Sequence, residues 1–131
     1  MPVTAQRDRM FAPLLLALVQ VATPATPATP ALAGDWIVDL TARPGDPPYR
    51  QPMRLALKPD GTVTGSFYRS EIQAGRWKTA RGRTCVSFRT TDGAGPYHTA
   101  ACSTGDRVSG QTWAEHRGFL FNWDAVRGVV R

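Results

Sequence analysis

The chain has few of the residues that build metal centres and redox sites. Only two of its 131 residues are cysteines, and two are histidines. Cys85 and Cys102 form no Cys-x-x-Cys motif, and no set of histidine and cysteine ligands lies near them in the sequence. A metal site or a redox pair is therefore not indicated, and the sequence predicts no cofactor.

A recognisable catalytic constellation is missing as well. His98 falls on the outward side of its expected strand and His116 falls in a turn, and the sequence places no serine or cysteine nucleophile beside either. Spacing alone does not join Asp39 and Asp124 into a carboxylate pair. Because catalysis needs a defined acid, base or nucleophile, we expect a protein that is not an enzyme.

Long hydrophobic runs are absent except near the start. The apolar stretch over residues 10–22 follows Arg7 and Arg9. It has the length of a signal-peptide core and is too short to span a bilayer comfortably. Residues 31–33, Ala-Leu-Ala, have the small side chains that a signal peptidase requires, so we place cleavage after Ala33. The alternative is a buried N-terminal helix, and Pro13 with the later prolines argues against it.

This boundary divides the chain into two parts. Residues 1–33 are predicted to be a signal peptide with a threefold Ala-Thr-Pro spacer over residues 22–30. Residues 34–131 are predicted to be a single domain, exported to the periplasm or to the outside of the cell. No further segment of this domain is apolar enough to cross a membrane.

The exported part alternates apolar and polar residues in short runs separated by tight turns. Turn signals stand at residues 59–61 (Pro-Asp-Gly), 81–83, 92–95 and 116–118. This spacing is typical of an all-β fold, and we expect about eight antiparallel strands in an up-and-down meander barrel. The expected strands cover residues 35–41, 51–58, 62–68, 75–80, 84–91, 97–103, 107–115 and 118–127.

The two cysteines lie on either side of one turn. Pairing the strands about Gly93 and the next residue places Cys85 opposite Cys102 and Val86 opposite Ala101. Directly opposite residues are close enough to bond, and an exported chain meets an oxidising compartment, so we expect a disulfide. Because the apolar parity is that of Val86 and Ala101, the bridge would lie on the outer face. The short loop that it closes predicts a contribution of about 3 kcal/mol.

The last hairpin has two possible registers. A turn at residues 116–117 places Gly110 opposite Trp123, and this register is favoured because glycine leaves room for the indole. A three-residue turn would instead place Trp113 opposite Phe121.

The Gly-x-Trp at residues 34–36 resembles the start of the first strand in the calycin group, which comprises lipocalins, fatty-acid-binding proteins and avidins. Residues 60–67 (Asp-Gly-Thr-Val-Thr-Gly-Ser-Phe) resemble the third-strand pattern of avidins. The resemblance implies a calycin-like small barrel. It does not extend to the biotin site, because Val38, Phe67 and Arg69 occupy positions where avidins carry hydrogen-bonding groups. We therefore expect no tight binding of biotin.

Two hypotheses for the function follow from this barrel. In the first, a small and largely apolar ligand binds at the mouth, with the Pro-rich loop 42–49 as a lid. In the second, the aromatic side chains only fill the barrel. The protein then acts through its outer surface, as an interaction or inhibitor module for another exported protein or for the cell envelope. The candidate ligand-binding residues of the first hypothesis are Trp36, Tyr49, Phe67, Phe88, Trp113 and Trp123.

A basic stretch surrounds one expected hairpin. Its cations are Arg76, Lys78, Arg81 and Arg83. Such a stretch indicates an anionic partner, or else simply a solvated outer face. A nucleic acid is not the expected partner of an exported protein. The sequence leaves the oligomeric state open.

Overall fold

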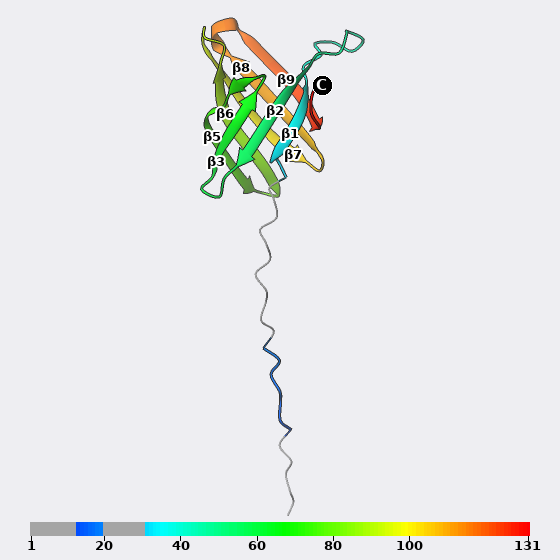
Figure 1. The fold of residues 1–131 in the computed structure, drawn as a ribbon, viewed down its shortest axis with the longest axis vertical. Coiled ribbons are helices and arrows are strands. Elements are labelled where there is room, and N and C mark those ends of the chain that lie inside the picture. Colours follow the sequence, from blue (N-terminus) through cyan, green and yellow to red (C-terminus); the bar gives the residue numbers. More distant parts are fainter. Residues whose placement is uncertain (1–12, 20–30) are drawn as a thin grey trace, which may run out of the picture.

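The computed structural model describes residues 13–19 and 31–131 of the chain (Figure 1). The expected spacer over residues 22–30, with Arg7 and Arg9, lies outside the described residues. Residues 13–19 have irregular backbone and exposed side chains. Within the described parts of the chain, no helix is long and apolar enough to cross a membrane.

Residues 34–127 form the expected all-β fold. The strands are β1 (Gly34–Asp39), β2 (Arg50–Leu57), β3 (Thr62–Phe67), β4 (Ser70–Glu71), β5 (Gln73–Ala80), β6 (Arg83–Thr91), β7 (Pro96–Thr104), β8 (Arg107–Ala114) and β9 (Phe119–Arg127). A 3-10 turn, η1 (Glu115–Arg117), joins β8 to β9. Every pairing is antiparallel, and β1 pairs with both β2 and β9, so eight strands close into an up-and-down barrel while the two-residue β4 pairs only with β3.

The barrel has two ends, which differ in their connections. The upper end in Figure 1 carries the loops 40–49, 68–72, 92–95 and 115–118. The lower end carries the tight turns 58–61, 81–82 and 105–106. The longest connection, 40–49, extends away from the barrel wall at the upper end.

The core follows from the strict alternation along each strand. Side chains at every second position point into the barrel, and in β6, for example, Val86, Phe88 and Thr90 are buried while Ser87 and Arg89 are exposed. Fourteen apolar side chains form one buried cluster, from Leu32 through Ala125. An eight-stranded barrel is narrow enough for such side chains to fill its interior.

Both expected hairpin registers are confirmed. Cys85 lies opposite Cys102, and the two are joined by a disulfide with a Cα–Cα distance of 4.0 Å. The bridge lies on the outer face, as the parity predicts, because its strand neighbours Val86 and Ala101 are buried. In the last hairpin Gly110 lies opposite Trp123, so the alternative pairing of Trp113 with Phe121 is wrong.

The contact between Gly110 and Trp123 shows why this register holds. A Cβ added to Gly110 would lie 2.3 Å from Cζ2 of Trp123, so the indole occupies the space that any other residue would need. Nε1 of the Trp123 indole donates a hydrogen bond to Oγ1 of Thr112 (3.0 Å), which lies two residues after Gly110 on β8. The tryptophan is therefore held in place by both shape and a polar contact.

The lower end is closed by residues from both ends of the domain. Leu32 is completely buried, and its carbonyl accepts a hydrogen bond from Nε1 of Trp36 (2.9 Å). The guanidinium of Arg127 lies 4.4 Å from the Trp36 ring centre and donates to the carbonyls of Ala33 (2.8 Å) and Ala31 (2.6 Å). The folded unit therefore extends back to Ala31, rather than beginning at Gly34 as the sequence suggests.

Candidate functional site

Three of the four inner aromatic residues predicted to line a ligand cup pack against one another. Trp36, Phe67, Phe88 and Trp123 are all buried. The Phe67 ring centre lies 5.7 Å from that of Phe88 and 5.4 Å from that of Trp123, in tilted arrangements. These are ordinary contact distances for aromatic pairs in a protein core, so Phe67, Phe88 and Trp123 pack together inside the barrel, while Trp36 belongs to the same buried cluster.

The buried polar groups of the interior bond to each other. Oγ1 of Thr99 and Oγ1 of Thr112 lie 3.0 Å apart, and Thr112 also accepts the hydrogen bond from Trp123. No buried side-chain nitrogen or oxygen in the described residues lacks a partner. The polar side chains of the described interior are therefore satisfied by partners within the protein.

Two of the predicted ligand-binding residues lie away from the interior. Trp113 is 40% exposed on the outer face of β8, opposite Leu120, because the confirmed register turns its neighbour Thr112 inward. Trp113 therefore does not share the barrel interior with Phe88, next to which it was expected. Tyr49 is exposed at the upper end, where its ring makes an edge contact with Tyr68 at 6.1 Å.

Two hollows in the described part of the chain both lie outside the barrel. One is a trough over β7, β8 and β9 around Gly110. The other lies beneath the Pro-rich loop. The trough is lined by Ala100, Ala101, Cys102, Ser109, Gly110, Gln111, Asn122, Trp123 and Asp124, and the second hollow by Asp39, Thr41, Arg43, Pro44, Pro48 and Arg50.

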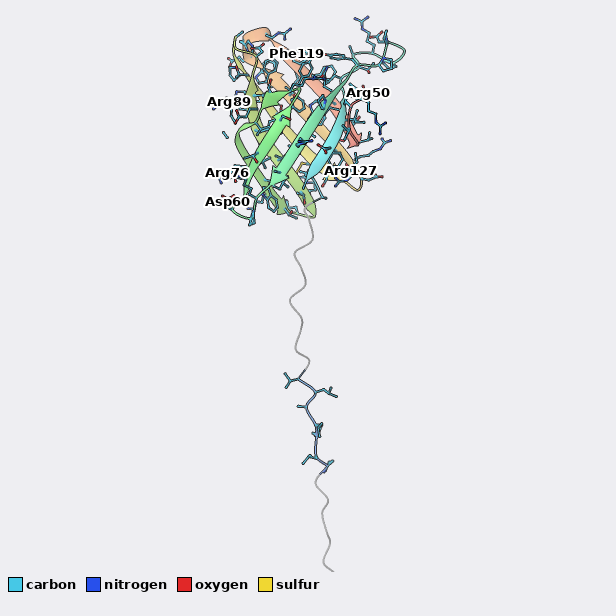
Figure 2. All side chains as sticks on the ribbon, viewed as in Figure 1. Arg50, Asp60, Arg76, Arg89, Phe119 and Arg127 are labelled. Carbon is cyan, nitrogen blue, oxygen red and sulfur yellow. A yellow bond between two sulfur atoms is a disulfide. The ribbon has the colours of Figure 1, made fainter. Side chains whose placement is uncertain are left out.

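The upper end also carries a group of aromatic side chains. Phe119 and Phe121 stack with ring centres 5.6 Å apart and an angle of 4° between their planes. Phe119 is 38% exposed, and the guanidinium of Arg117 lies 5.8 Å from its ring centre. Figure 2 shows Phe119 at the top of the barrel. These two rings form an aromatic shelf at the mouth, above the filled interior.

The basic stretch forms one face of the barrel. Arg76 and Lys78 are exposed on the outer face of β5, and Lys78 lies opposite Cys85 of the disulfide. Arg83 is exposed at the start of β6, and Arg81 is exposed in the turn between the two strands. Among the described residues, none of these four cations has a carboxylate within 4.0 Å. We call the four residues the basic face.

A polar latch, which sequence reasoning did not find, joins two upper loops. Asp92 accepts hydrogen bonds from the backbone N–H groups of Ala94 (2.8 Å) and Gly95 (3.2 Å). The hydroxyl of Tyr97 donates to its other oxygen (2.8 Å), and Arg117 donates to that hydroxyl (2.8 Å). The hydrogen bonds from Ala94 and then Tyr97 are the main reasons that the pKa of Asp92 is lowered to about 2.

His116 completes the latch. Its Nε2 lies 3.7 Å from Oδ1 of Asp92, and its ring makes an edge contact with Tyr97 at 5.3 Å. A Cβ on Gly95 would lie 2.6 Å from the imidazole, so glycine is needed beneath it. The sequence signal was the Asp-Gly turn itself, but a local pattern does not report a contact with a loop twenty residues further on.

Asp39 and Asp124 lie opposite each other on β1 and β9. The carboxylates serve different neighbours, because Asp39 accepts a hydrogen bond from the backbone N–H of Thr41 (2.9 Å) and Asp124 one from the hydroxyl of Ser109 (2.9 Å). Hydrogen bonds from Thr41 lower the pKa of Asp39. Both carboxylates are thus occupied locally, and the described residues contain no group of three or more possible metal ligands.

No protein-family model, no curated protein and no solved structure matches this chain. The closed eight-stranded antiparallel barrel is consistent with a calycin-like fold.

Acid should open the latch. Because the folded-state pKa of Asp92 is below its ordinary value of 3.8, its contribution is complete above about pH 4 and is lost as the pH falls through about 2. We expect the ring signals of Tyr97, whose hydroxyl donates to Asp92, to shift in an NMR titration with a midpoint near pH 2. Asp92→Asn should abolish this transition, while Asp46→Asn, in the exposed Pro-rich loop, should retain it. A transition centred at the ordinary pKa of aspartate would contradict the assignment.

Proposed function

We propose that the protein is an exported interaction module, which acts through the outside of a filled barrel by contacting an anionic polymer of the cell envelope. The observation that carries this proposal is the packing of Phe67 against Phe88 and Trp123, which leaves these side chains as core. A barrel whose interior is occupied by its own side chains has its surface available for recognition.

Both the N-terminal sequence and the disulfide support export. The basic and apolar start of the sequence is typical of a signal peptide. The disulfide between Cys85 and Cys102 is typical of proteins that fold in an oxidising compartment. The barrel itself fits this destination, since a small domain benefits from a covalent staple.

We also propose a distant relationship to avidin-like or lipocalin-like barrels. The Gly-x-Trp at residues 34–36 stands at the start of β1, and residues 60–67 run from a tight turn through β3. Val38 and Phe67 are apolar and buried, where a biotin site would need hydrogen-bonding groups. The proposed relationship therefore concerns architecture and excludes tight biotin binding.

The basic face supports an anionic partner. Its cations project from two neighbouring strands and the turn between them, and Arg76 lies opposite the neutral residues Ser87 and Thr62. Asp60, in the turn before Thr62, is an acidic residue close to Arg76. Unpaired cations on one side of a small protein create a positive field that attracts polyanions and weakens with salt. The disulfide joins β6 to β7 beside Lys78, so the face is held on a stapled sheet. Figure 2 places Arg76 and Arg89 on the same side of the barrel.

Neutralising this face should remove most of the binding. We expect the variant Arg76→Gln, Lys78→Gln, Arg83→Gln to bind polygalacturonate, a carboxylated polysaccharide, about tenfold or more weakly at low salt. The control Arg43→Gln, Arg107→Gln, Arg131→Gln removes the same number of exposed cations elsewhere and should bind within about threefold of the unmodified protein.

Binding isotherms at several salt concentrations provide the measurement. Equal losses in the two variants would show attraction by net charge alone and would contradict a defined basic face. Tighter binding to anionic vesicles or to nucleic acid than to the polysaccharide would contradict the proposed class of partner.

The aromatic shelf favours a second candidate function, the binding of a small, largely apolar ligand at the mouth. Phe119 presents a partly exposed ring on top of Phe121, and the pair Tyr49 and Tyr68 is exposed at the same end. In this proposal the ligand lies on the rim and does not enter the barrel.

A pair of neighbouring substitutions tests the shelf. Phe119→Ala should weaken the binding of an apolar fluorescent dye by about threefold to tenfold, because one aromatic contact is lost. Leu120→Ala should leave the affinity unchanged, since Leu120 belongs to the opposite face of β9. The fluorescence titration would argue against the shelf if both variants bound the dye as tightly as the unmodified protein.

A further inference from the structure

Leu32 is an integral part of the barrel core. Its side chain has no exposed surface, although it precedes the first strand. It belongs to the same buried cluster as Trp36 and Val108, both of which are also completely buried. An apolar side chain in this position acts as a plug for the lower end, and its removal would leave a cavity or open the core to water.

The backbone around Leu32 is held as firmly as its side chain. Three successive carbonyls, those of Ala31, Leu32 and Ala33, accept hydrogen bonds from Arg127 and Trp36. Loss of these acceptors would leave the indole N–H of the buried Trp36 without a partner and would release the guanidinium. Such a contact set is not expected of a segment that is discarded before folding.

A cut after Ala33 would also introduce an unfavourable charge. Gly34 would then carry the new α-ammonium group. Nη1 of Arg127 lies 3.1 Å from the position that a Cβ on Gly34 would occupy, so the two cations would be neighbours. The Ala-Leu-Ala sequence taken alone indicates cleavage after Ala33. In the folded protein, however, this cleavage would be unfavourable.

We propose that residues 31–33 remain on the exported protein as the plug of the barrel, and that the signal peptidase cuts on the N-terminal side of Ala31. The enzyme adds water across one peptide bond, leaving a carboxylate on the signal peptide and an amine on the mature chain. The Ala-Thr-Pro repeats supply suitable sequences, because Ala25 and Ala28 each have a threonine two residues earlier. This inference depends on the export part of the proposed function.

The experiment compares the full chain with its Leu32→Ala variant, both exported by a bacterial host and purified in mature form. N-terminal sequencing and intact mass give the start of each chain. We expect both chains to start after the apolar stretch over residues 10–22 and no later than Ala31. The mature Leu32→Ala protein should melt about 10 °C or more below the unmodified protein. Leu120→Ala, at a residue 57% exposed, should change the melting temperature by only a few degrees.

The opposite results are equally clear. A folded mature chain that begins at Gly34, with Leu32→Ala identical to the unmodified protein in mass and melting temperature, would overturn the inference but leave export intact. A chain that keeps residues 1–30 would instead refute export and the cut together. If the Leu32→Ala protein does not accumulate, the mass of the volume-conserving Leu32→Met variant decides whether residue 32 is retained.

Discussion

The contact of Arg127 with the start of the chain is the constraint on which the rest of the barrel depends. Its guanidinium lies over the Trp36 ring and binds two carbonyls of residues 31–33, so the last strand is tied to the segment before the first. This contact accompanies the pairing of β1 with β9 that closes the sheet. It also holds Leu32 in the lower opening. Closure removes the free edges that an open meander would expose to aggregation.

In the proposed function, the closed and plugged barrel acts through its outer surface. Because alternate residues of each strand face inward, the side chains of Phe67, Phe88 and Trp123 meet inside the barrel. The same alternation turns the intervening residues outward, and on β5 and β6 these include the basic face. The two-residue alternation along the strands thus produces both the packed core and the charged outer surface.

The architecture and the two hairpin registers could be predicted from the sequence, because turn signals and the alternation of inward and outward residues are local features. Gly110 was interpretable in advance, since only glycine accommodates a facing indole. The contact of Arg127 with the start of the chain could not be predicted, because its partners Ala33 and Ala31 lie 94 and 96 positions earlier in the sequence and no local pattern reports it. The bulge between Gln73 and Arg76 and the latch of Asp92 with His116 likewise depend on neighbours distant in the sequence. Trp113 lies on the outer face of β8 because its neighbour Thr112 faces inward, and its aromatic character gives no sign of this.

Hydrogen exchange of the tryptophan indole N–H groups tests the filled barrel most directly. Nε1 of Trp36 and Nε1 of Trp123 are buried and bonded to Leu32 and Thr112, whereas Trp113 lies on the outer face. The indole N–H groups of Trp36 and Trp123 should therefore exchange only when the barrel opens, orders of magnitude more slowly than that of Trp113. Exchange of Trp36 and Trp123 at a rate close to that of Trp113 would reveal a water-filled cup and contradict the account.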